Sequence, residues 1–159
     1  MTSNEQLIHT LYTAFQKKDY QTMGACYHNE ATFQDAVFNL RTGHEIRSMW
    51  EMLCKQSRDF ALEYSNVKTN GDQGSAHWEA RYTFSRTGRE VLNKIDAAFE
   101  FKDGLIIKHN DTFDFYAWSK QAMGLSGILL GWTSFFHNKV KSTAAAGLQA
   151  FMNKQTKSS

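Results

Sequence analysis

The sequence predicts one α+β domain, in which N-terminal helices pack on a single antiparallel sheet and a helical extension follows. Two patterns support this class. Apolar residues recur at helical spacing up to about residue 56, and they alternate with polar residues over residues 59–116. Three turn signals divide the alternating region, at Asn70-Gly71, Thr87-Gly88 and Asp103-Gly104. Because the helices precede the strands instead of alternating with them, consecutive strands are expected to pair antiparallel.

Three helices are predicted before the alternating region. The first covers roughly residues 4–18, where Ser3 and Gln6 have the spacing of a capping box. A short second helix follows it, and a third begins after Thr42, which has Glu45 at the same spacing. The predicted inward stripes are Leu7, Ile8, Leu11, Tyr12 and Phe15, then Tyr20, Met23 and Tyr27, then Ile46, Met49, Trp50 and Leu53.

The sheet is predicted to contain one short strand and four long ones. The short strand falls within residues 31–38, between the second and third helices. The long strands form a meander over roughly residues 59–69, 74–86, 89–102 and 105–116.

The segment after residue 116 is predicted to be helical. A short helical segment over residues 119–130 precedes a longer helix that Thr133 or Ser134 can cap. Residues 115–159 contain five lysines and no acidic residue. We expect this extension to cover a pocket or to form a dimer contact. Membrane contact is the less favoured interpretation of its apolar residues Ile128, Leu129, Leu130 and Trp132.

The composition excludes several classes of protein. The polar N-terminus lacks a signal-peptide pattern, and the longest apolar run is far below the ~20 residues of a membrane span. Cys26 and Cys54 form no CxxC pair, which suits free thiols in a reducing cytoplasm. No zinc-finger, RNP or glycine-rich phosphate-binding motif is present, so nucleic acid is not an expected partner. Proline is absent, so turns depend on Gly, Asn and Asp.

Strand alternation places His109 and Asp111 on the covered face of the sheet. They share the parity of Leu105, Ile107, Phe113 and Phe115. Burying an ionisable pair is costly unless the pair is satisfied or used. We interpret it as a candidate acid–base pair, in which the carboxylate orients the imidazole. The alternative is a satisfied polar cluster in an inactive pocket.

Asp35 is expected to join this pair, because it shares a face with Phe33 on the first predicted strand. Two carboxylates and one imidazole from separate strands are a weak metal-ligand pattern, so we expect no metal and no other cofactor. The substrate is expected to contact a mostly aromatic lining made of Trp78, Tyr82, Phe33, Trp50, Phe113 and Leu11.

The orientation of Asp96 depends on the strand register. A two-residue turn pairs Lys102 with Leu105 and places Asp96 opposite Asp111 in the pocket. A three-residue turn pairs Phe101 with Leu105 and turns Asp96 outward, unless a bulge restores it. We prefer the three-residue turn because it pairs apolar residues with each other.

The ATFQD strand, the TGHEIRSMWEML helix and the four-strand meander resemble the nuclear transport factor 2-like, or SnoaL-like, superfamily over about residues 4–116. Its members include ketosteroid isomerases, scytalone dehydratase, limonene epoxide hydrolase and polyketide cyclases. The resemblance implies a cone-shaped, cystatin-like α+β roll for residues 1–116. It also implies a homodimer. Residues 117–159 resemble the C-terminal helical extensions of uncharacterised bacterial members.

The resemblance also implies roles for single residues. Asp35 matches the first-strand base of the isomerases, although the proline that often follows it is missing here. Asp96, in KID, resembles their oxyanion-hole aspartate. Their oxyanion tyrosine would fall at Leu11, with Tyr12 one residue away. These departures argue against steroid isomerisation.

The last strand carries the similarity that we weight most. His109 and Asp111, in KHND, are similar to the H-W-D of SnoaL-type cyclases, in which the aspartate is the acid and base. The expected function is cofactor-free isomerisation, dehydration or cyclisation of a small apolar substrate by Asp111 and His109, with assistance from Asp35. The alternative is a non-catalytic ligand-binding or dimeric scaffold domain.

Overall fold

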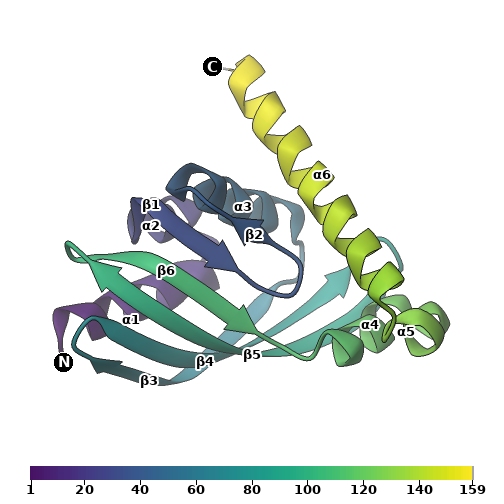
Figure 1. Cartoon of the computed structure of the whole chain (residues 1–159), viewed down its shortest axis with the longest axis horizontal. Helices are drawn as coiled ribbons and strands as arrows, with labels where there is room; N and C mark the ends of the chain where they lie inside the picture. Colours follow the sequence, from purple (N-terminus) through teal and green to yellow (C-terminus); the bar gives the residue numbers. More distant parts are fainter. Residues whose placement is uncertain (159) are drawn as a thin grey trace.

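The computed structural model describes residues 1–158 and contains one sheet with six helices (Figure 1). The N-terminal helices are α1 (Ser3–Gln16), α2 (Tyr20–Ala25) and α3 (Gly43–Gln56). The strands are β1 (Tyr27–Gln34), β2 (Asn39–Leu40), β3 (Ala61–Asn70), β4 (Gln73–Phe84), β5 (Arg89–Lys102) and β6 (Leu105–Thr112). The extension forms α4 (Phe115–Met123), α5 (Leu125–Leu130) and α6 (Ser134–Ser158).

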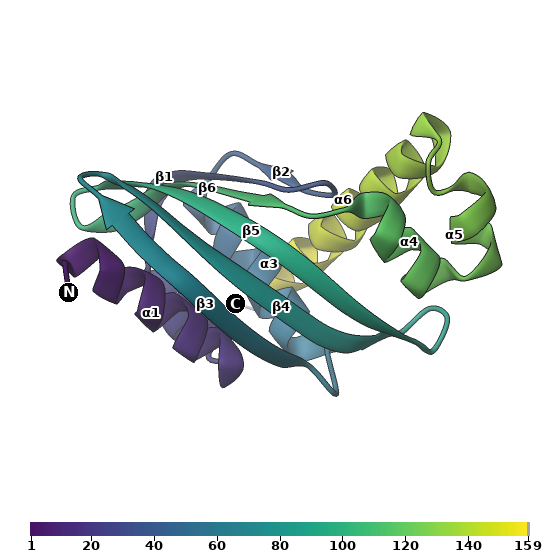
Figure 2. The ribbon, with the colours of Figure 1, turned by 90° about the horizontal axis from the view of Figure 1, so that it is seen from below.

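The six strands form a curved sheet in the order β2-β1-β6-β5-β4-β3. The meander from β3 to β6 is antiparallel, as predicted, but β1 pairs parallel with β6. Helices α1 and α3 lie on the inner side of the curve, where α1 contacts β3 and α3 contacts β1 (Figure 2). The core fills the space between these helices and the sheet, so the predicted α+β class is confirmed.

The helices begin at polar caps. Thr2, and not Ser3, caps α1: its hydroxyl accepts the Glu5 N–H, and the Glu5 carboxylate accepts the Thr2 N–H. At α3, Thr42 accepts the Glu45 N–H as predicted. Leu53, placed on the inward stripe of α3 by its spacing, is instead exposed.

The turn between β5 and β6 differs from the preferred prediction. Lys102 pairs with Leu105 across a two-residue turn, in which Asp103 and Gly104 both have positive φ. This is the conformation that matches the twist of a hairpin. A β-bulge then shifts the register between Glu100 and Phe101. The three-residue turn preferred from the sequence is therefore wrong.

The bulge changes which residues of β6 point inward. Phe101 pairs with Ile106, which is fully buried, whereas Leu105 and Ile107 are only half-buried. Beyond the bulge, Phe99 pairs with His109, so the inward parity at His109 is the predicted one. One extra residue in a strand has this effect because alternation has a period of two.

Two strand boundaries also differ from the prediction. β1 begins at Tyr27, which the helical pattern placed on the second helix. β6 ends at Thr112 because Asp114 caps α4, its side chain accepting the Ala117 N–H. The chain then leaves the sheet, and Phe113 lies beyond the strand.

The extension packs back on the domain through α6. Leu148 is buried in the core, and α6 contacts α3. His137 Nε2 lies 2.5 Å from the Ala36 carbonyl oxygen, which ties the start of α6 to the turn after β1. Within residues 1–158, no helix is both long and apolar enough to cross a bilayer.

Candidate functional site

A pocket of about 450 Å³ lies between the inner face of the sheet, α3 and the C-terminal extension. Its walls include five of the six residues predicted to contact a substrate: Phe33, Trp50, Trp78, Tyr82 and Phe113. The extension completes the walls with Trp118 and Met123 of α4 and Val140 and Ala144 of α6. Most of the lining is apolar, so the pocket suits a small molecule of low polarity.

A row of buried hydrogen bonds ends at the pocket on Asp111. The Trp50 indole N–H donates to Tyr27 Oη at 3.1 Å, and Tyr27 Oη lies 2.8 Å from His109 Nδ1. His109 Nε2 lies 2.8 Å from Asp111 Oδ1. Of these four residues, Trp50 and Asp111 line the pocket, while Tyr27 and His109 lie behind it.

The donors and acceptors of this row can be assigned for a neutral His109 beside a carboxylate Asp111. The carboxylate can only accept, so His109 Nε2 carries the hydrogen at that end; the Trp50 indole N–H can only donate to Tyr27 Oη, and Tyr27 gives its own proton to the bare His109 Nδ1. Burial, followed by the charge of Asp111, raises the pKa of Tyr27 well above 10, so the hydroxyl keeps that proton. A neutral His109 must therefore carry its hydrogen on Nε2 and donate it to Asp111.

Asp111 is oriented from two sides. The Trp78 indole N–H also donates to Asp111 Oδ1, at 3.4 Å. The N–H groups of His109 and Trp78 thus both meet Oδ1 of Asp111. No group within residues 1–158 donates to Oδ2. That oxygen is left for a molecule in the pocket, which Asp111 lines.

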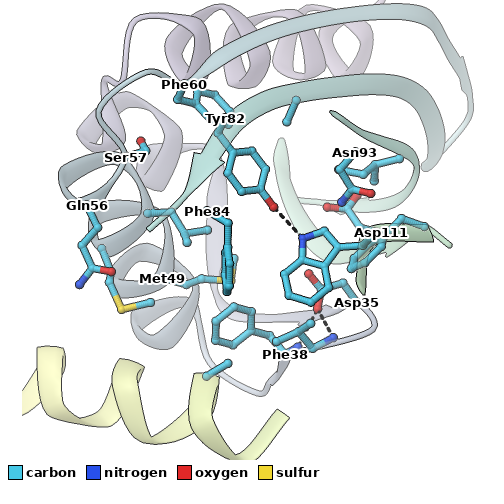
Figure 3. Close-up of a pocket in the computed structure, with 18 of the residues that line it drawn as sticks. Asp35, Phe38, Met49, Gln56, Ser57, Phe60, Tyr82, Phe84, Asn93 and Asp111 are labelled. Atoms are coloured by element: carbon cyan, nitrogen blue, oxygen red, sulfur yellow. Dashed lines mark hydrogen bonds between the residues drawn. The ribbon is translucent and has the colours of Figure 1, made fainter. Parts of the chain in front are cut away.

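Asp35 supplies a second carboxyl group to the same pocket. Its Oδ1 accepts the Val37 and Phe38 N–H groups at 2.7 and 2.6 Å, because the chain turns sharply between β1 and β2. Burial raises the pKa of Asp35 to about 6, although the two N–H groups oppose this rise. Figure 3 shows Asp35, Asp111 and Asn93 on one side of the pocket, opposite Met49 and Gln56.

Two polar groups of the pocket were missed by sequence reasoning in this role. Tyr82, predicted only as lining, accepts the Trp118 indole N–H at 2.8 Å, so its own proton is free to be donated into the pocket (Figure 3). Asn93 lines the pocket and makes no side-chain hydrogen bond within residues 1–158. Asn93 had a signal, because it is the polar member of the apolar set Val91, Ile95, Ala97, Phe99 and Phe101.

Besides His109, three other predicted site residues lie outside the pocket. Asp96 is 82 % exposed on the outer face, where its carboxylate meets His77 Nδ1 at 2.8 Å, because the register turns it away from Asp111. Tyr12 is buried and stacks on Tyr64, and its hydroxyl has no partner within residues 1–158. Leu11 is a core residue. The structure therefore does not bring Asp96, Tyr12 or Leu11 into the pocket, where catalytic roles for the first two and a substrate contact for Leu11 were predicted.

The arrangement can move a proton. Asp111 offers a carboxyl oxygen that no group within residues 1–158 donates to, Asp35 offers a second carboxyl group whose pKa is raised by burial to about 6, and Tyr82 and Asn93 offer hydrogen-bond donors to a polar atom of a bound molecule.

Solved structures support the fold. An M. tuberculosis LEH-like epoxide hydrolase is 19 % identical, with a TM-score of 0.62, over 80 % of this chain and 96 % of that chain. A putative SnoaL-like polyketide cyclase from Shewanella putrefaciens is 17 % identical, with a TM-score of 0.64, over 76 % and 86 %. A hypothetical protein with a ketosteroid isomerase-like fold from Catenulispora acidiphila, in complex with trimethylamine, is 8 % identical, with a TM-score of 0.65, over 74 % and 92 %.

Sequence comparison identifies the family. No functionally curated protein matched the chain. The family model of the SnoaL-like domain matches residues 8–109, which run from within α1 to within β6 and include Asp35 and His109. The match covers more than half of the chain and agrees with the curved sheet and its neighbours. This protein therefore belongs to the SnoaL-like domain family.

Proposed function

We propose that this protein binds a small, largely apolar molecule in the pocket and catalyses a cofactor-free proton transfer on it. The reaction is of the isomerase, dehydratase or cyclase type. Asp111 removes a proton, His109 holds the carboxylate in place, and Asp35 returns or shares the proton. Tyr82 and Asn93 donate hydrogen bonds to an oxygen of the substrate that gains charge.

One observation carries this proposal: Asp111 is aimed into an apolar pocket by two donors on a single oxygen while its other oxygen has no protein donor. A carboxylate buried only for structure would be expected to use both oxygens.

The test begins with native mass spectrometry of the purified protein, which identifies any retained small molecule. That molecule and a panel of cyclic ketones are then incubated with the protein in D₂O, and NMR follows exchange of their C–H hydrogens. Asp111→Asn should abolish exchange, because the amide is not a base, and should keep the fold. Asp72→Asn, which removes an exposed carboxylate, is the matched control.

A non-catalytic ligand-binding protein is the alternative function. It would bind a molecule in the pocket without exchanging any hydrogen, and Asp111→Asn would change affinity only. The homodimer implied by the family resemblance is proposed for either function, and light scattering of the pure protein tests it.

A further inference from the structure

The short helix α5, the segment that joins it to α6 and the first turn of α6 expose a group of large apolar side chains. Leu125, Leu129, Trp132 and Phe135 are 60–77 % exposed, and Ile128 and Leu130 are 49 % exposed. We call these six residues the α5 tip. Elsewhere in residues 1–158, only Met1 and Leu53 are exposed large hydrophobic residues. An apolar cluster of this kind on one end of a protein marks an interaction surface.

The α5 tip is held outward by the backbone of α4. Gly127 packs so closely on α4 that a Cβ atom would overlap the Ser119 carbonyl oxygen. Tyr116 Oη donates to the Ile128 carbonyl oxygen at 3.1 Å, and the Trp132 indole N–H donates to the Leu129 carbonyl oxygen at 3.0 Å. Figure 1 shows α5 at the end of the molecule beside α4. The apolar side chains therefore point away from the domain.

The surroundings of the tip are basic. Residues 115–159 hold five lysines and no acidic residue, whereas the rest of the chain holds 13 basic and 16 acidic residues. Positive charge is thus concentrated in the segment that carries the tip, and the remainder of the molecule is net negative.

Individual lysines lie beside the apolar residues. Lys120 Nζ is 4.7 Å from the ring centroid of Tyr116, the residue that holds α5. Lys139 follows Phe135 by one turn on the same face of α6. Lys120, Lys139 and Lys141 are exposed, and none forms a salt bridge within residues 1–158.

We propose that the α5 tip docks this protein on the surface of an anionic phospholipid bilayer. The apolar residues enter the boundary between headgroups and acyl chains, Trp132 lies at that boundary, and the lysines meet the phosphates. A second copy of the chain fits less well, because a two-fold contact would bring these lysines together with no acidic residue to pair them. Docking would also place α6, which forms part of the pocket wall, next to a phase that dissolves apolar molecules.

The first experiment uses vesicles of phosphatidylcholine, alone and with phosphatidylglycerol. Flotation at low salt should recover the protein with the anionic vesicles only, and high salt should release it. Trp50, Trp78 and Trp118 are buried, so a change in tryptophan emission reports Trp132. Brominated lipids should quench that emission, and Trp132→Phe should remove the quenched signal. Flotation with neutral vesicles to the same extent, or an unquenched Trp132, would overturn the proposal.

Substitutions distinguish vesicle binding through the α5 tip from a general effect of positive charge. Leu129→Ser with Phe135→Ser should abolish flotation, and Lys120→Gln with Lys139→Gln and Lys141→Gln should weaken partitioning by on the order of 100-fold, about fivefold per lysine. Lys17→Gln with Lys94→Gln and Lys102→Gln, also exposed, is the matched control and should have little effect. An equal loss in this control overturns the proposal. So does a dimer that the serine variant converts to monomer without any vesicle binding.

Discussion

Tyr27 Oη lies 2.8 Å from His109 Nδ1, and this contact determines which nitrogen of His109 faces Asp111 with a hydrogen. Tyr27 comes from the first strand and His109 from the last, 82 residues later. The parallel pairing of β1 with β6 brings them together. The orientation of the candidate base therefore depends on a residue that does not itself line the pocket.

Tyr27→Phe should release His109 from a single tautomer. It leaves the Trp50 N–H and His109 Nδ1 without their partner, so the free energy of unfolding should fall by roughly 1–3 kcal/mol. NMR of ¹⁵N-labelled imidazoles should show His109 with its hydrogen on Nε2 in the parent protein and a mixture in the variant. Tyr64→Phe removes a hydroxyl bonded to His9 and is the control, since it should leave the His109 signals unchanged. If His109 keeps the same tautomer in Tyr27→Phe, the directions assigned to the hydrogen bonds between Trp50 and Asp111 are wrong.

Asp35 should make the fold less stable as the pH rises. Its pKa is about 6 in the folded protein and 3.8 in its ordinary state, so the folded protein binds more protons between these values. The free energy of unfolding should fall from about pH 4 to about pH 6, by up to ~3 kcal/mol from this group. Asp35→Asn keeps an oxygen for the Val37 and Phe38 N–H groups and should flatten the slope, as urea unfolding across pH would measure.

Asp59 should change the pH dependence of stability in the direction opposite to Asp35. Hydrogen bonds from Thr83 lower its pKa, so its contribution to stability is present at neutral pH and is lost on acidification through the lowered value. Asp59→Asn should therefore remove stability near neutral pH, where Asp35→Asn adds it. Identical trends in the two variants would contradict the account of both carboxyl groups.

Tyr82→Phe should weaken the binding of ligands that carry an oxygen. The Tyr82 hydroxyl accepts from Trp118 and has its proton free, so its loss removes one donor and should reduce affinity about tenfold. Trp118→Phe is the matched control for the broken Tyr82–Trp118 contact, because Tyr82 keeps its hydroxyl. Calorimetry should find weaker binding in Tyr82→Phe than in Trp118→Phe, and equal losses would remove Tyr82 as a donor.

Two glycines should respond to alanine in opposite ways. Gly127→Ala forces a Cβ atom onto the Ser119 carbonyl oxygen, so α5 must shift from α4 and the melting temperature should fall. Gly147 lies within α6 with open space around its Cα, and Gly147→Ala should stabilise the protein by roughly 0.5–1 kcal/mol. Calorimetric melting of both variants tests whether the contact between α4 and α5 carries stability.

Much of this architecture follows from local patterns. The period-two alternation and the Asp103-Gly104 signal predicted the meander, and the same alternation placed His109 and Asp111 inward. Asp35 was also expected to point inward, and it lines the pocket. His109 and Asp111 could be predicted because side chains alternate between the two faces along a strand. Asp35 lies in the turn after β1, so alternation does not explain its position.

The remainder depends on contacts between distant segments. The bulge at Ile107 is set by how β5 and β6 pack, and it makes the inward side of Ile106 differ from the one that alternation predicts. Tyr27 joined the site because β1 starts soon after α2 and pairs parallel with β6, which no local spacing specifies. Trp118 reaches Tyr82 from the extension, beyond the region that resembles relatives. Asn93 is the exception among the missed residues. The sequence pattern could have revealed it, because it is the polar residue among apolar residues that point to the same side of the strand.

Because α6 forms one wall of the pocket, two separate parts of the chain supply its carboxyl groups and its apolar side chains. Asp111 and Asp35 stand on the sheet side, while Val140 and Ala144 come from the last helix. Reactivity and selectivity can thus change separately. Bulkier or smaller residues at the two α6 positions would alter which molecules fit, and the row from Trp50 to Asp111 would stay intact. A library randomised at those two positions alone would change which ligands the pocket accepts and leave the proposed proton-transfer residues unaltered.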